Sequence, residues 1–370
     1  MRVTYYRPTM PQVSAAIPVS TKREARLMIT SALRRGTTRG ILMATAAVGV
    51  AALLTACASG TPAPTTEPTQ DAPTTTVDPH SPELASIKVT GIKGPGVVPL
   101  IVAADKFSEQ YGLTIEYVPA DNSGVAITQV VSGDVASANA SYFGVIDAIA
   151  QGLPLVVAAE GWASTPETGF LMARAGSGIE ELADLTGKTV NVISLTSSHA
   201  IKLRDSMVAE GLDPDEVNWV ELPYSEVAAA FEQGTIDASS AVGPTLAAVR
   251  GAGATPVFDY GSGSYAGMAE SGWITSTTFV AQNPNTIAAF QCAIFAAQGA
   301  LNTDRALYEE YFQSFLGAPE AAAKADVMLD FQTTNRIDAL NRNVEVYEAS
   351  GLLGQSIDFA DHTLAAPTNC

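Results

Sequence analysis

Residues 112–161 read "GLTIEYVPADNSGVAITQVVSGDVASANASYFGVIDAIAQGLPLVVAAEG", and this stretch decides the fold. Apolar residues mostly alternate in 113–120, as in a half-buried strand, and Asn122 or Ser123 then caps a helical stretch. A short run of small residues, a second helical stretch and the apolar strand 154–162 follow. Strands and helices that alternate in units of about thirty residues are typical of parallel βαβ architecture. The sequence therefore predicts an α/β fold.

The same alternation continues on both sides of this stretch. Upstream, a strand is expected at 87–92 and a helix from about 98 to 110, with Gly112 following its end. Downstream, a second series of strands and helices fills residues 179–261, and the chain is helical from 285 onward. Extended segments at 169–177 and 272–284 connect the two series.

Two such series joined by two extended crossings predict a bilobed protein with a two-strand hinge. The first lobe is expected to comprise residues 87–170 and 273–370, and the second lobe residues 171–272. The C-terminal helices complete the first lobe.

The N-terminal region has the pattern of an export signal. Basic residues at 34–39 precede the apolar run 41–54, which is too short for a transmembrane helix of about 20 residues. The run ends in Leu54-Thr55-Ala56-Cys57, which resembles the lipobox of bacterial lipoproteins. The resemblance implies that residues 1–56 are a removed signal peptide and that Cys57 carries a lipid. An ordinary signal peptide with a chance cysteine, a start at Met28, and export by the general or the twin-arginine route stay open.

A polar stretch follows the lipobox. Residues 58–86 consist mainly of Thr, Pro, Ala, Asp and Glu, and such a composition buries too little apolar surface to fold. We expect a lipid-anchored disordered linker at 57–86 that holds a folded body at the outer face of the cell membrane.

The composition of the body limits its partners. Without residues 1–56, the chain has 12 Lys and Arg and 37 Asp and Glu, which gives a formal charge of −25. Nucleic acids and anionic membrane surfaces require cationic patches, so we expect neither as a partner. A small anionic ligand stays possible because a pocket has its own local field. In an exported protein, Cys292 and Cys370 are expected to form a disulfide.

The ordered set of segments in residues 86–353 resembles the solute-binding proteins of ABC importers. Besides 112–161, the set includes "DLTGKTVNV" at 184–192, "AEGLDPDEVNWVELP" at 209–223 and "AAAFEQGTIDASSAVGP" at 228–244. The resemblance is to the nitrate, sulfonate and taurine branch, which also includes binders of thiamine pyrimidine precursors. It implies a periplasmic-binding-protein-like fold of type II. A monomer without a cofactor would pass a small solute from the interlobe cleft to an ABC permease.

In such a fold the ligand lies where strands end and helices begin. Thr196, Ser197 and Ser198 open a helix there, and its free N–H groups and dipole favour an anionic or accepting group. Alternatively, the three hydroxyls only cap the helix. His199 is not expected to act as a base, because adjacent helical side chains diverge by about 100° and no G-x-S-x-G elbow is present. We therefore expect binding without catalysis.

Further candidates follow from the same topology. They are Gly94, Gly96, Asn122, Ser123, Asn139, Ser141, Tyr142, Trp162, Gly243 and Trp273. The aromatic residues could stack on a solute, although the two tryptophans could instead pack at the hinge. Arg174 could bind a sulfonate or carboxylate or form a structural salt bridge. Acidic residues at strand ends, including Asp121, Glu160 and Asp237, could bind an amine.

Two other functions stay open at this point. One is an enzyme on the same scaffold, similar to the pyrimidine-precursor synthases, and the other is a module that reports its ligand state to a membrane receptor. The ligand itself is also open. Hydroxyls at a helix N-terminus suit a sulfonate, nitrate or carboxylate, whereas aromatic and amide groups suit a pyrimidine.

Overall fold

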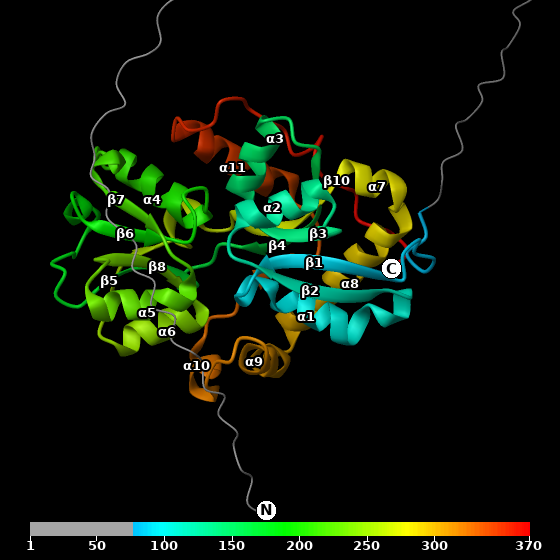
Figure 1. The fold of residues 1–370 in the computed structure, drawn as a ribbon, viewed down its shortest axis with the longest axis horizontal. Helices are drawn as coiled ribbons and strands as arrows, with labels where there is room; N and C mark the ends of the chain where they lie inside the picture. The colour runs from blue at the N-terminus through cyan, green and yellow to red at the C-terminus, as the bar shows by residue number, and fades with distance from the viewer. Residues whose placement is uncertain (1–76) are drawn as a thin grey trace, which may run out of the picture. The chain divides into compact units, whose positions relative to one another are not determined.

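The structure is a computed structural model that describes residues 77–370 (Figure 1). The predicted signal peptide, Cys57 and most of the predicted linker lie outside the described residues. The described strands form two sheets, each with helices on both faces.

The first sheet has the strand order β11-β4-β10-β3-β1-β2. Its strands are β1 (Ser86–Ile92), β2 (Thr114–Ala120), β3 (Ser137–Ser141), β4 (Leu155–Ala163), β10 (Ala269–Ser276) and β11 (Asp330–Phe331). β1 is parallel to β2 and β3, with Val89 opposite both Tyr117 and Ser137. β10 runs antiparallel between β3 and β4.

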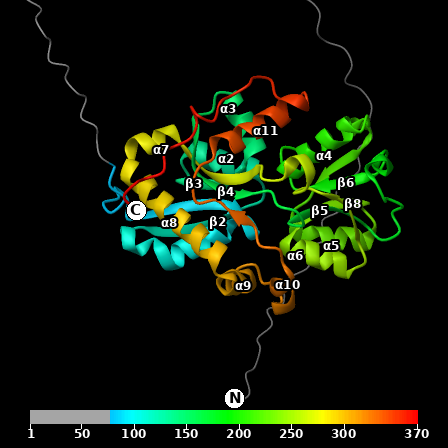
Figure 2. The ribbon, with the colours of Figure 1, turned by 180° about the vertical axis from the view of Figure 1, so that it is seen from behind.

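Helices cover both faces of this sheet and form two apolar cores with it. They are α1 (Val98–Val102), α2 (Ser123–Ser132), α3 (Tyr142–Ala150), α7 (Thr277–Gln282), α8 (Pro284–Thr303), α9 (Arg305–Ser314), α10 (Glu320–Ala325) and α11 (Ile337–Ala349). One core contains Leu100 of α1 and Phe290 of α8, and the other contains Phe143 of α3 and Leu340 of α11. Figure 2 shows α8 running across the sheet. This sheet and its helices are called the first lobe.

The helix boundaries follow the predicted capping residues. Asn122 is the N-cap of α2, and its Oδ1 accepts a hydrogen bond from the Val125 N–H at 3.0 Å. The helical segment that begins with α1 continues to residue 111 and ends at Gly112, whose φ of 66° is left-handed as predicted.

The second sheet has the order β7-β6-β8-β5-β9 and forms the second lobe. Its strands are β5 (Gly169–Ala173), β6 (Thr189–Val192), β7 (Asn218–Glu221), β8 (Ala238–Val242) and β9 (Thr255–Asp259). Its helices are α4 (Ser198–Ala209), α5 (Tyr224–Gln233) and α6 (Gly243–Gly251). α4 lies on one face of the sheet, and α5 and α6 lie on the other (Figure 1).

The two extended crossings are more than connections, because each also supplies a strand to a sheet of the predicted βαβ architecture. The first predicted segment contains β5 and the second contains most of β10. Each of these strands runs antiparallel to its neighbours. The parallel strands β3 and β8 end at the side where the lobes meet. A chain that arrives from the other lobe enters at that side and runs away from it. Both sheets are therefore mixed, and we propose residues 164–168 and 260–268 as the lobe boundaries.

Both ends of the described chain are fastened to α8. The Glu83 carboxylate accepts hydrogen bonds from the N–H groups of Asn285 (3.0 Å) and Thr286 (2.8 Å) at the start of the helix. The predicted disordered linker at 57–86 thus overlaps an ordered stretch, because Glu83 caps a helix that is distant in sequence. At the other end, Cys370 forms the expected disulfide with Cys292, with the Cα atoms 5.4 Å apart.

Candidate functional site

A cavity of about 110 Å³ is lined by side chains from both lobes. A single buried water requires only about 10–15 Å³, so the cavity has room for a small solute. Eight of the residues predicted from the sequence line it. They are Gly94, Gly96, Ser123, Asn139, Ser141 and Trp162 in the first lobe and Ser197 and Ser198 in the second. The loop after β1 approaches Trp162 so closely that a Cβ on Gly96 would lie 2.9 Å from the Trp162 Nε1.

Four polar side-chain atoms at this cavity are buried and have no partner among the described residues. They are Asn139 Nδ2, Ser141 Oγ, Ser198 Oγ and Ser271 Oγ. A buried polar atom without a hydrogen bond costs about 1–3 kcal/mol, and native proteins keep few of them. Several such atoms around one cavity indicate a place for a polar ligand.

Three helices begin at the cavity. Ser123 is the first residue of α2, Ser141 is the N-cap of α3, and Ser197 is the N-cap of α4 as predicted. The Ser197 hydroxyl accepts a hydrogen bond from the Ala200 N–H at 3.3 Å. Ser123 Oγ accepts one from the Ser141 N–H at 3.1 Å. The free N–H groups and dipoles of these helices favour an accepting or negative group.

His199 also lines the cavity and is buried. Its ring stacks on Tyr260 with the centroids 4.2 Å apart. Burial lowers the pKa of His199 to about 4; the charge of Lys202 adds to this effect, and Glu270 opposes it. The imidazole is therefore neutral at neutral pH. The Ser198 hydroxyl, which has no partner in the described chain, is not paired with it.

Two predicted aromatic residues lie away from the cavity. Tyr142 is fully buried in the first lobe, edge-on to Phe359. Trp273 is fully buried on the middle of β10, where its Nε1 donates to Gln298 Oε1 at 3.2 Å and its ring meets Phe290. Of the two roles considered for Trp273, the position supports packing.

Three more predicted residues lie beside the cavity. Asn122 caps α2 and does not line the cavity. The Thr196 hydroxyl forms a hydrogen bond with Ser194 Oγ at 3.1 Å, and Thr196 lies next to Gly144 of the first lobe. Gly243 has a φ of +47°, and a Cβ there would lie 2.6 Å from Pro95 Cγ in the first lobe. Glycine is therefore required at this contact between the lobes.

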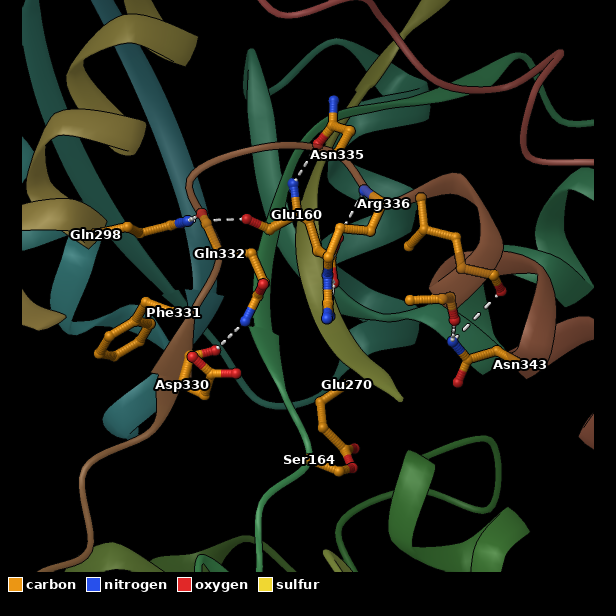
Figure 3. Close-up of polar contacts among 12 residues, drawn as sticks. Glu160, Ser164, Glu270, Gln298, Asp330, Phe331, Gln332, Asn335, Arg336 and Asn343 are labelled. Carbon is orange, nitrogen blue, oxygen red and sulfur yellow. Dashed lines mark hydrogen bonds and ion pairs between the residues drawn. The ribbon is translucent and has the colours of Figure 1, made fainter. Parts of the chain in front are cut away.

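The ionic candidates are mostly engaged elsewhere. Arg174 is paired with Asp237 at 3.0 Å, away from the cavity, so its structural alternative is the correct one. Glu160 is fully buried, and Arg336 donates to both of its oxygens, with Nε at 3.1 and 3.2 Å (Figure 3). Burial raises the pKa of Glu160 although Arg336 opposes the shift. Asp121 lines a neighbouring cavity.

Sequence reasoning missed a buried ion pair at the crossings. Lys202 of α4 donates to Glu270 Oε1, to Ser164 Oγ at 2.5 Å and to the Tyr260 carbonyl at 3.1 Å. Ser164 also donates to the Glu270 carboxylate, beside which it lies in Figure 3. Glu270 lines the cavity. Burial alone would raise the pKa of Glu270, but the charge and hydrogen bond of Lys202 outweigh it and lower the pKa. The available signal was the spacing of Lys202 four residues after Ser198, on one helix face.

Two negative findings concern residues 77–370 only. They contain no group of three or more His, Cys, Asp or Glu side chains placed to hold a metal ion. In the same range, every helix is too short or too polar to cross a membrane.

Comparisons with known proteins agree with this architecture. The taurine-binding periplasmic protein of Escherichia coli (strain K12) is 23% identical over 205 residues, 53% of this chain and 60% of that protein. The chain thus matches about 60% of the length of this relative. The alkanesulfonate-binding protein SsuA from Xanthomonas axonopodis pv. citri, bound to MOPS, superposes with a TM-score of 0.66 and 20% identity. The match covers 77% of this chain and all of SsuA.

A third neighbour names the fold. The Candida albicans CA3427 gene product, described as having the generic periplasmic binding protein structural fold, matches with a TM-score of 0.64 and 17% identity. The match covers 76% of this chain and 97% of that one. The predicted fold is thereby confirmed. The family model described as NMT1/THI5 like matches residues 95–303, more than half of the 370 residues, and the chain belongs to the NMT1/THI5-like family.

Proposed function

We propose that the protein is the solute-binding component of an ABC importer and captures a small solute between its lobes. The observation that carries this proposal is the cavity with four buried polar atoms that have no partner among the described residues. A solute with matching polar groups would satisfy them and remove their desolvation cost.

The connection between the lobes supports capture by closure. The chain passes between the sheets at residues 164–168 and 260–268, and two short crossings can act as a hinge. The lobes touch where Gly243 meets Pro95. A solute that contacts both lobes binds the closed arrangement better than an open one and shifts the population toward it. A permease partner would then recognise the closed form.

The cavity lining narrows the solute class. Among the described residues that line it, Glu270 carries a charge and no Lys or Arg is present. An anionic group would therefore be bound by hydroxyls and helix N-termini, as suits a sulfonate, taurine or nitrate. The same groups suit a pyrimidine precursor. Taurine and an alkanesulfonate are named for two of the similar proteins, so they belong among the first probes.

We further propose that residues 1–56 are a signal peptide and that Cys57 carries a lipid, which holds a monomeric body at the outer face of the membrane. The lipobox and the polar linker support this. Mass spectrometry of the mature protein should find a lipidated N-terminal cysteine. An unmodified Cys57 would contradict the anchor without affecting the binding proposal.

Thermal unfolding of the purified full chain tests the solute-binding function. The panel contains alkanesulfonates, taurine, nitrate, bicarbonate and thiamine-precursor pyrimidines. A ligand at about 100 times its dissociation constant stabilises the folded state by roughly 2.7 kcal/mol, a shift of several degrees. At least one class should produce such a shift. The absence of a shift with every probe would contradict the proposed solute classes.

A further inference from the structure

The two oxygens of the Glu270 carboxylate differ in the hydrogen bonds that they accept. Lys202 and Ser164 both donate to Oε1. In the described part of the chain, no hydrogen bond reaches Oε2. The side chain is only 3% exposed and lines the cavity between the lobes. A carboxylate oxygen accepts hydrogen bonds through two lone pairs, so Oε2 is an acceptor available to a solute in the cavity.

Lys202 itself has no donor left for a solute. An ammonium group has three N–H bonds, and those of Lys202 are directed to Glu270 Oε1, Ser164 Oγ and the Tyr260 carbonyl. Lys202 is 0% exposed and does not line the cavity. Lys202 therefore neutralises Glu270 and orients it from behind, and the cavity is left with an oxygen acceptor of little net charge.

We propose that Glu270 determines solute specificity: its Oε2 accepts a hydrogen bond from a neutral N–H or O–H group of the solute, and Lys202 and Ser164 are positioning residues. The inference rests on the proposed solute-binding function and deepens it. The solute would carry an amino or hydroxyl donor at one end. At the other end it would carry an acceptor for the starts of α2, α3 and α4.

Electrostatics favour a solute with a neutral donor over a solute without a donor and over a solute with an ammonium group. A solute end that has no donor, such as the methyl end of ethanesulfonate, would displace water from Oε2 without replacing its hydrogen bonds. An ammonium group gains attraction from Glu270 but is repelled by Lys202, whose charge already balances the carboxylate. A neutral donor obtains the hydrogen bond without this repulsion. The adjacent Ser271 hydroxyl, also without a partner in the described chain, can serve the same solute group.

Calorimetric titration of the full chain with matched probes tests the inference. One pair is an aminopyrimidine and its dimethylamino analogue, which lacks the N–H donor. The other set is 2-hydroxyethanesulfonate, ethanesulfonate and taurine, which present a hydroxyl, no donor and an ammonium group. Within the series that binds, the neutral donor should bind about 10- to 100-fold more tightly than its donor-free analogue, and taurine should be weaker than the hydroxyl compound.

Two variants assign this preference to Glu270. Glu270→Gln replaces one oxygen by an N–H group and should reduce the preference for the donor to less than about threefold. Because a lone charge on Lys202 could destabilise that variant, the pair Glu270→Gln and Lys202→Met is made as well and should lose the preference in the same way. Ser177→Ala is the control. It removes another buried hydroxyl without a partner in the described chain, away from the cavity, and should keep the preference.

The outcomes distinguish a failure of the role of Glu270 from a failure of the solute-binding function. A donor preference in the wild type that disappears in both Glu270 variants supports the inference. Tight binding without a donor preference, a preference for taurine, or a preference that survives in both variants overturns the inference and leaves the solute-binding function intact. A lack of binding by all five probes to the wild type overturns the inference alone. The thermal-unfolding panel, which also contains nitrate and bicarbonate, then decides the solute-binding function.

Discussion

Replacing Lys202 by methionine should destabilise the protein strongly, because the change leaves a buried carboxylate without its counter-ion. Lys202 is 0% exposed and Glu270 3% exposed. Removal of one partner from a buried ion pair costs about 3–5 kcal/mol. For a domain of this size, 1 kcal/mol corresponds to about 2 °C, so the melting temperature should fall by about 6–10 °C at pH 8.

The double replacement of Lys202 by methionine and Glu270 by glutamine is the matched control. It removes both charges and keeps side chains of similar volume. Buried ion pairs replaced in this way often lose little stability, so the double variant should recover most of the deficit.

The deficit of Lys202→Met should depend on pH in one direction. Without Lys202, burial raises the pKa of Glu270 in the folded state above its unfolded value near 4.3. A group with a raised folded pKa contributes stability at low pH that is lost as the pH rises through the folded pKa. The difference between variant and wild type should therefore be smaller at pH 5 than at pH 8.

Thermal unfolding followed by circular dichroism at both pH values measures these differences. A Lys202→Met variant within 1 kcal/mol of the wild type at pH 8 would show that Glu270 does not depend on Lys202 as its counter-ion. So would a deficit that grows toward pH 5, because it would mean that Glu270 is not the group left without its partner.

Three further predictions concern other parts of the structure. The imidazole of His199 should titrate near pH 4 by NMR, with its signal assigned by the absence of that signal in His199→Gln. Its depressed pKa should contribute stability that is present above pH 6.5 and lost as the pH falls through 4. A titration midpoint near 6.5 would contradict the burial of His199. Cys370→Ser removes a crosslink between residues 78 positions apart and should reduce the free energy of unfolding by roughly 4 kcal/mol, measured by urea unfolding; a loss below 1 kcal/mol would mean that the disulfide with Cys292 does not fasten the tail. Gly243→Ala should weaken solute binding because the added Cβ would meet Pro95 and separate the lobes. Gly234→Ala is the control, since Gly234 also has a positive φ but a Cβ there would have no atom nearer than 4.0 Å, and this variant should keep the affinity. Equal affinities of the two variants would exclude closure at this contact.

The sequence predicted the parts of the fold that depend on local patterns. Alternating apolar residues identified β2, and the caps at Asn122 and Ser197 and the left-handed Gly112 appear where they were expected. The direction of β5 and β10 could not be read in this way. An extended segment has the same pattern whether it runs parallel or antiparallel, and only its pairing with a distant strand decides.

The candidate site was predicted as a location more accurately than as a set of side chains. Strand ends do converge on the cavity, but a position at a strand end does not say where a side chain points. Trp273 lies two residues beyond Ser271 on β10, yet it packs on Phe290 in the core. Register shifts in this part of β10 disturb the simple alternation. The pair of Lys202 and Glu270 joins residues 68 positions apart, and nothing local distinguishes Glu270 from the other acidic residues.

Whether the solute lies between the lobes is decided by comparing Ser198→Ala with Ser177→Ala, using the probe that binds the wild type best. Both variants remove a buried hydroxyl that has no partner in the described chain, but only Ser198 lines the cavity. Neither change should lower the stability of the free protein by more than about 0.5 kcal/mol, because no hydrogen bond within the protein is lost. Titration calorimetry should find the affinity of Ser198→Ala reduced roughly 3- to 10-fold and that of Ser177→Ala unchanged. Equal affinities in the two variants would contradict the claim that the solute lies between the lobes.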